Sequence, residues 1–246
     1  MTLLFAPPCA TCDAPLDQPS ASSVCQACWQ AIGRWSPPWC VRCGQPHAAW
    51  RADADICPRC RRIPAALPVR AVGPYEGRLR DVLHAFKYDG RRSLAPPLAA
   101  LVRAQSADLL AAADVLVPVP LHRARRRSRG FNQAHDLAAA LGPPVVAALR
   151  RIRATTAQTE LTAGGRRRNV RGAFAIAPAG YRRGSWSAES RRRAMTEAIA
   201  GRVVVLVDDV ITTGATLEAC AAVLRAAGAA DVRAVTVARA VIGRRR

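Results

Sequence analysis

Eight of the nine cysteines form four pairs with the same spacing, in which two residues separate the sulfurs. This spacing lets a tight turn direct both thiolates at one metal ion, and two such turns complete a tetrahedral shell. A shell made only of sulfur leaves no position for water, which is typical of structural rather than catalytic zinc sites. We therefore predict two structural zinc ions, held by Cys9, Cys12, Cys25, Cys28, Cys40, Cys43, Cys57 and Cys60.

The spacing leaves open which cysteine pairs share an ion. In a sequential arrangement the first and second pairs share one ion and the third and fourth share the other, but a crossed arrangement also satisfies the ligand count. Disulfides would require an oxidising compartment, and residues 1–8 lack the basic start and the length of a signal peptide. We therefore expect zinc ligands in a cytoplasmic protein.

A second group of residues with chemical potential follows an apolar run at 203–207. Asp208 and Asp209 come directly after this run, and small and hydroxyl-bearing residues follow at 212–216, before a helical pattern at 217–227. A β-branched run without alternation predicts a strand that is buried on both faces, as in a parallel sheet. Because backbone N–H groups at the entry to a helix bind anions, we expect this turn to cradle a phosphate group.

Two carboxylates beside a phosphate cradle suit a ligand that carries hydroxyl groups as well as phosphate. The segment 205–216 resembles the 5-phosphoribosyl-1-pyrophosphate (PRPP) signature of type I phosphoribosyltransferases. The resemblance implies that Asp208 and Asp209 are catalytic and hold the ribose hydroxyl groups, while the following turn wraps the 5′-phosphate. The further residues that it assigns to PRPP binding are Val210, Thr212, Thr213, Gly214, Ala215 and Thr216.

Other segments resemble the pyrophosphate-binding parts of the same enzymes. Residues 117–123 match the pyrophosphate loop, which implies contacts from Pro120 and Leu121 and a catalytic role for Arg123. A guanidinium suits this role because its fork matches phosphate oxygens. An arginine run lies in the place of the mobile hood and is either a pyrophosphate clamp or a solvated charge run. Its members are Arg166, Arg167 and Arg168.

Together with the cysteine pairs, these motifs resemble the ComF family of competence-associated, phosphoribosyltransferase-like proteins over nearly the whole chain. Residues 86–88 also resemble the family's segment that leads into the catalytic domain. The resemblance implies an α/β fold, with a type I phosphoribosyltransferase-like parallel sheet that has helices on both faces and follows a small double zinc ribbon. We expect the ribbon at 1–62 and the larger domain at 63–246, with a flexible insertion at 178–201.

The resemblance also implies a reaction. Mg²⁺ would bridge oxygens of the PRPP pyrophosphate and ribose, and an acceptor that the sequence does not identify would attack C1′ as pyrophosphate leaves. The rival interpretation is a competence or DNA-uptake factor that binds single-stranded DNA, with DNA-uptake or recombination proteins as partners. In that case the PRPP site serves as a sensor or is a vestige.

The charge of the chain permits both interpretations. The 246 residues carry a formal charge of +20, and Lys87 is the only lysine among 37 basic residues. Acidic and basic residues balance within 1–60, so the whole excess lies in 61–246. It indicates either an anionic partner or a genome that favours arginine codons. We predict no membrane span, because the sequence contains no run of 18 uninterrupted apolar residues.

Overall fold

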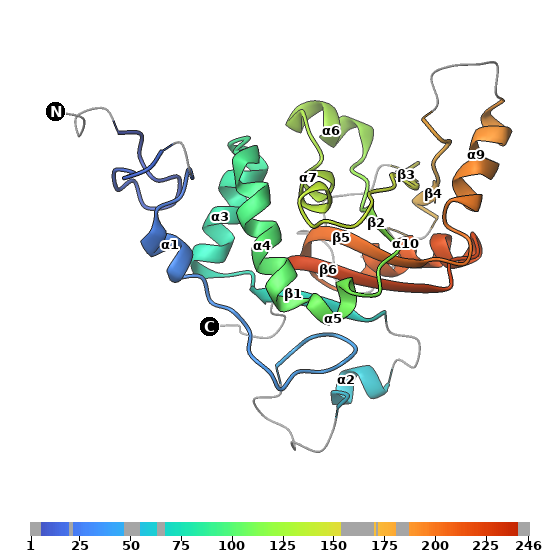
Figure 1. The fold of residues 1–246 in the computed structure, drawn as a ribbon, viewed down its shortest axis with the longest axis horizontal. Coiled ribbons are helices and arrows are strands. Elements are labelled where there is room, and N and C mark those ends of the chain that lie inside the picture. The colour runs from blue at the N-terminus through green and yellow to red at the C-terminus, as the bar shows by residue number, and fades with distance from the viewer. Residues whose placement is uncertain are drawn as a thin grey trace.

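The computed structural model describes residues 6–19, 22–46, 55–62, 67–153, 170, 172–180 and 187–240. Its centre is a four-stranded parallel sheet with the order β1-β6-β5-β2 (Figure 1). The strands are β1 (Val69–Pro74), β2 (Val115–Pro118), β5 (Val203–Ile211) and β6 (Asp231–Arg239). The predicted parallel sheet is confirmed.

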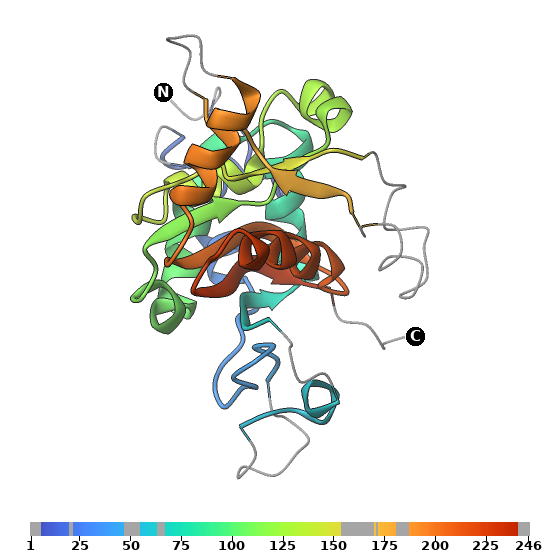
Figure 2. The same cartoon turned by 90° about the vertical axis from the view of Figure 1, so that its right-hand side faces the viewer.

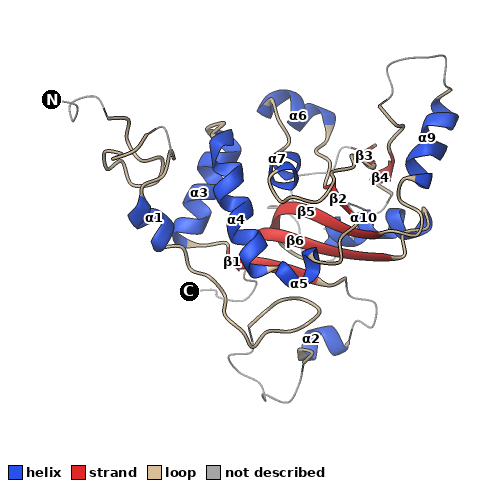
Figure 3. Cartoon of the chain, in the orientation of Figure 1, coloured by secondary structure: helices blue, strands red, loops and turns tan. Residues whose placement is uncertain are grey.

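Helices cover both faces of the sheet (Figure 3). Val205 and Val207 of β5 pack in the core that includes α3 (Gly77–Tyr88), α4 (Ala95–Gln105) and α7 (Gln133–Ala139). The alternate residues Val204 and Leu206 pack in the core that includes α10 (Ala215–Ala226). Because both sets of alternating side chains meet apolar helices, the strand is apolar throughout.

Smaller elements complete the larger domain. The hairpin of β3 (Leu149–Arg151) and β4 (Phe174–Ile176) is antiparallel. Helix α9 (Ala188–Glu197) lies within the stretch 178–201, and residues 181–186 of that stretch lie outside the described residues. The remaining elements are α1 (Gln26–Gln30), α2 (Pro58–Arg61), η2 (Arg92–Leu94), α5 (Ala107–Leu110) and α6 (Arg123–Arg129).

The first half of the cysteine-rich module packs against α3. Leu16, Val24 and Ile32 are buried in the same core as the apolar side of this helix. At the start of α3, Arg78 Nη1 donates a hydrogen bond to the carbonyl oxygen of Thr11 at 2.7 Å. The second half of the module, which contains α2, projects beyond β1 in the views of Figure 1 and Figure 2.

The segment between these halves follows the outer edge of β1. Trp35 N–H donates to Val72 O at 2.9 Å, and Val69 N–H donates to Arg42 O at 2.7 Å. These bonds occupy a strand edge that would otherwise be open to pairing with another chain. The cysteine-rich module is therefore joined to the sheet by main-chain bonds as well as by the core. Among the described residues, no helix has the length and apolarity needed to cross a bilayer.

Candidate functional site

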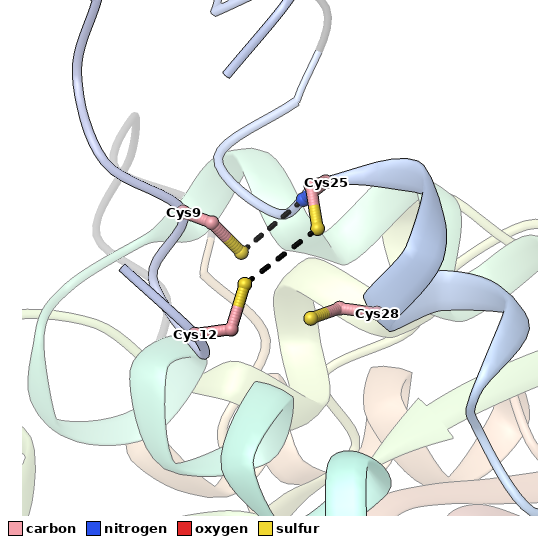
Figure 4. Close-up of side chains that lie close together, drawn as sticks. All are labelled: Cys9, Cys12, Cys25 and Cys28. Carbon is pink, nitrogen blue, oxygen red and sulfur yellow. Dashed lines mark hydrogen bonds between the residues drawn. The ribbon is translucent and has the colours of Figure 1, made fainter. Parts of the chain in front are cut away.

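The eight paired cysteines form two tetrads of converging sulfurs, and the pairing is sequential. Within each tetrad the sulfurs lie within 4.8 Å of one another. Figure 4 shows the first tetrad, which consists of Cys9, Cys12, Cys25 and Cys28. Cys12 Sγ lies 3.8 Å from Cys25 Sγ, and Cys43 Sγ lies 3.7 Å from Cys57 Sγ. A tetrahedral zinc ion with Zn–S bonds of about 2.3 Å places its sulfurs about 3.8 Å apart. The donor set and its dimensions therefore fit two structural zinc ions.

Backbone N–H groups point at several of these sulfurs. Cys25 N–H donates to Cys9 Sγ at 3.3 Å, and Cys57 N–H donates to Cys40 Sγ at 3.4 Å. A hydrogen bond from the Cys43 side chain lowers the pKa of Cys40 to about 4, helped by backbone N–H groups and opposed by burial. Such donors favour the thiolate, which is the form that binds zinc.

The two predicted catalytic acids lie near the carboxyl end of β5. The strand continues past residue 207, where the sequence pattern ends, because Val210 and Ile211 still pair with β6. Adjacent residues of a strand point to opposite faces. Asp209 therefore follows the face of Val207, toward α3, and Asp208 follows the face of Leu206, toward α10.

Asp209 forms an ion pair with Lys87 of α3. The Nζ atom of Lys87 lies 3.0 Å from Oδ2 of Asp209, and the two side chains are only 12% and 7% exposed. Nζ also lies 5.6 Å from the centroid of the Tyr75 ring. Burial acts to lower the pKa of Lys87, but Asp209, together with Tyr75 and Asp208, raises that pKa above its usual value. Lys87 is therefore charged in the folded protein.

Asp208 has a different environment. Burial, together with the neighbouring charge of Asp209, raises the pKa of Asp208 to about 8. The Asp209 N–H group, which donates to Asp208 Oδ1 at 2.9 Å, and the Lys87 ammonium both oppose this rise. Near neutral pH the Asp208 carboxyl is therefore largely protonated, and it can both donate to and accept from a hydroxyl group.

The turn at 212–214, where the sequence predicts an anion cradle, leads from β5 into α10. Gly214 is the N-cap of α10 with φ of +84°, a conformation that favours glycine. Thr213 Oγ1 accepts a hydrogen bond from Ala215 N–H at 3.4 Å. The twelve-residue helix α10 directs its positive end at this turn. The predicted phosphate-binding residues thus lie on the same side of the sheet as Asp208.

The predicted pyrophosphate loop lies at the same edge of the sheet. Val119 N–H donates to Val207 O at 2.9 Å, which extends the pairing of β2 with β5 up to the loop. Asn132 Nδ2 donates to Val119 O at 3.2 Å and holds the loop from the other side. Pro120 and Leu121 are partly exposed there, and Arg123 is exposed at the start of α6. The hood arginines Arg166, Arg167 and Arg168 lie outside the described residues.

Sequence reasoning assigned no role to two cations that the structure places at this site. Lys87 has a recognisable signal, because it is the only lysine in the chain. Arg151 of β3 lies over the Phe174 ring at 5.4 Å. Burial and the nearby Arg125 lower the pKa of Arg151, and the attraction of Asp208 partly opposes this shift. Nothing in the sequence distinguishes Arg151 from the other arginines around it.

Comparisons with known proteins agree with this architecture. Residues 1–61 match the model of a double zinc ribbon domain, and residues 127–246 match that of a phosphoribosyl transferase domain. Competence protein F of Haemophilus influenzae is 30% identical over 230 residues, which cover 89% of this chain and 91% of that protein. DNA utilization protein YhgH of Salmonella typhimurium is 30% identical over 236 residues, covering 92% and 93%.

A third relative is more distant. Competence protein ComFC of Bacillus subtilis is 27% identical over 236 residues, which cover 88% of this chain and 84% of that protein. The similarity to these proteins covers 88–92% of the chain, so it extends into both the cysteine-rich module and the larger domain. The chain therefore belongs to the ComF family, whose members join a double zinc ribbon to a phosphoribosyltransferase-like domain.

Proposed function

We propose that this chain is a cytoplasmic, PRPP-binding phosphoribosyltransferase-like protein that transfers the phosphoribosyl group to an acceptor and releases pyrophosphate. The observation that carries the proposal is the position of Asp208, at the end of β5 and on the side of the sheet where α10 begins. A sugar phosphate suits a site with a carboxyl group at one end and a helix N-terminus at the other, since its hydroxyl groups and its phosphate lie at opposite ends. Ligands of parallel α/β sheets bind at this edge.

Each part of the site has one task in this proposal. Asp208 exchanges hydrogen bonds with the ribose hydroxyl groups, and the turn at 212–216 holds the 5′-phosphate through backbone N–H groups. The loop with Pro120 and Leu121, together with Arg123, faces the pyrophosphate. Catalysis then consists of holding acceptor and C1′ in line and of neutralising the leaving pyrophosphate.

The site suits Mg²⁺ that arrives with PRPP. Mg²⁺ binds through one or two carboxylates plus substrate phosphates and keeps several waters, so it needs no protein cage. Asp209 is already paired with Lys87 and Asp208 is assigned to the ribose hydroxyl groups, so the ion would be held mainly by PRPP oxygens and water. When bound, the ion neutralises charge on the pyrophosphate.

Calorimetry with Mg–PRPP tests the proposal. We expect wild-type protein to bind Mg–PRPP, and we expect the double variant Asp208→Asn/Asp209→Asn to lose binding while its circular dichroism is unchanged. The matched control is Asp231→Asn, which removes a carboxylate at the opposite end of the sheet, where Asp231 pairs with Arg233. Unchanged affinity in the double variant would contradict the assignment of the acid pair. Pyrophosphate release in the presence of individual nucleobases or amines then identifies the acceptor.

A second function is favoured by a surface next to this site. Tyr88, at the end of α3, is 63% exposed, with the Arg129 guanidinium 5.1 Å from its ring centroid and the His84 ring 4.7 Å away. The adjacent helix α6 carries five arginines and no buried residue. An exposed aromatic ring beside clustered cations suits the stacked bases and phosphates of single-stranded DNA. The competence and DNA-utilization names of the relatives agree with such a partner.

Fluorescence anisotropy with single-stranded DNA at several salt concentrations tests this second function. We expect Tyr88→Ala and the double variant Arg126→Ala/Arg127→Ala to weaken binding. The double variant should also flatten the dependence of log affinity on log salt concentration. The matched control, Arg192→Ala/Arg193→Ala, removes the same charge from the exposed helix α9. Equal losses in the two double variants would show that only total charge matters.

A further inference from the structure

The single lysine of the chain is placed where the acid pair needs a counter-ion. Every other one of the 37 basic residues is arginine, yet the residue that meets Asp209 inside the protein is Lys87. An ammonium concentrates its charge on one atom and contacts a single carboxylate oxygen, whereas a guanidinium fork spans both oxygens. The arginine-rich composition does not account for a lysine at this position, but the geometry of the ion pair does.

The backbone around Lys87 is held firmly, so its side chain reaches Asp209 from a fixed point. The preceding residue, Phe86, is fully buried and contacts the Phe131 ring at a centroid distance of 5.8 Å. Leu83, one turn earlier on α3, is also fully buried. Fixing the long lysine stem still costs rotamer freedom, which the buried ion pair with Asp209 must offset.

We propose that Lys87 is a positioning residue of the phosphoribosyl site, which fixes and neutralises Asp209 so that Asp208 alone meets the hydroxyl groups of the ligand. This inference rests on the proposed function. Without a counter-ion, two adjacent carboxylates repel each other, which leaves neither with a fixed orientation. With Lys87 in place, the Asp209 carboxylate is held in a defined orientation, with Oδ2 at 3.0 Å from the ammonium. The pair is thereby divided into one structural and one ligand-facing carboxyl.

Lys87 could instead attract the anionic ligand directly, and a double-mutant cycle separates the two roles. Calorimetry with Mg–PRPP at pH 7 is carried out on wild type, Lys87→Met, Asp209→Asn and the double variant Lys87→Met/Asp209→Asn. We expect Lys87→Met to weaken binding about tenfold in the wild-type background, in the range found for contacting charged pairs. In the Asp209→Asn background the same change should weaken binding less than about twofold, because Lys87 acts through Asp209.

Two further variants serve as controls. Lys87→Arg keeps the charge but presents a wider guanidinium fork, so it should lose less affinity than Lys87→Met. Arg80→Met removes one charge from an exposed position on α3 and should leave the affinity unchanged. If Lys87→Met does not fold, as judged by circular dichroism, then Lys87→Gln takes its place in the cycle.

The outcomes are distinct. Unchanged affinity in Lys87→Met overturns the inference. Equal losses in both backgrounds show direct attraction of the ligand and also overturn it. If the wild-type protein binds no Mg–PRPP, the proposed function fails, and the inference that rests on it fails with it. The inference about Lys87 therefore fails by itself only if the wild-type protein binds Mg–PRPP and one of the first two results is found.

Discussion

The N–H group of Val119 donates a hydrogen bond to the carbonyl oxygen of Val207 at 2.9 Å, which joins the end of β2 to the residue before Asp208. This bond brings two segments separated by more than eighty residues to one edge of the sheet. One is the loop that the sequence assigns to pyrophosphate, and the other is the acid pair with its phosphate turn. Ligands of parallel sheets bind at such an edge because the loops that follow neighbouring strands diverge there.

The zinc content of the protein should follow the two tetrads. We expect two zinc ions per chain in the wild type and one in Cys12→Ser or Cys43→Ser, because each variant removes a ligand from one tetrad. Elemental analysis of the purified proteins measures this ratio. The control is Cys220→Ala, since Cys220 of α10 is buried in the core with the sheet, outside both tetrads. A Cys220→Ala protein with fewer than two zinc ions would contradict the assignment.

The stability of the protein should depend on pH through Asp208. Its folded-state pKa of about 8 lies above the usual value of 3.8, so the folded state binds a proton that the unfolded state releases between these values. The contribution of Asp208 to stability is therefore full below pH 3.8 and is lost as the pH rises through 8.

Asp208→Asn should escape this loss. We compare the melting temperature of Asp208→Asn with that of wild type at each pH. The difference, variant minus wild type, should be larger at pH 9 than at pH 5 by about 4 °C or more. Scanning fluorimetry at the two pH values measures the difference. Asp231→Asn, which changes a partly exposed acid, should show the same melting temperature relative to wild type at both pH values. A pH-independent difference for Asp208→Asn would mean that its carboxyl titrates normally in the folded state.

The contact between the cysteine-rich module and the edge of β1 depends on a glycine without space for a side chain. A Cβ atom on Gly73 would lie 2.1 Å from the carbonyl oxygen of Gly33. Gly73→Ala should therefore lower the free energy of unfolding by about 1–3 kcal/mol, as overpacking does. The other member of the contact provides the control, because a Cβ atom on Gly33 meets nothing within 4 Å. Denaturant unfolding should show Gly33→Ala close to wild type, and equal losses in the two variants would be inconsistent with this contact.

The local chemistry of both sites could be predicted from contiguous residues. A two-residue spacing between cysteines defines a metal turn by itself, and a buried strand that ends in two acids and a small-residue turn defines a ligand-binding edge. The strand is nevertheless longer than its apolar run, because pairing with β6 carries the extended backbone through Val210 and Ile211. The sequence pattern ends at residue 207, where side chains stop being uniformly apolar, but hydrogen bonding to a neighbour does not depend on side-chain polarity.

By itself, the sequence determined the residues that each site brings together locally: the cysteine pairs of the sulfur shells, and an acid pair before a turn of small residues. Only the tertiary structure decided which cysteine pairs share a tetrad, that the cysteine-rich module follows the edge of β1, and that Lys87 meets Asp209. The physical reason is distance along the chain. A motif of a few residues sets its own geometry through bond lengths and turns, whereas Lys87 and Asp209 meet only because α3 packs on that face of the sheet.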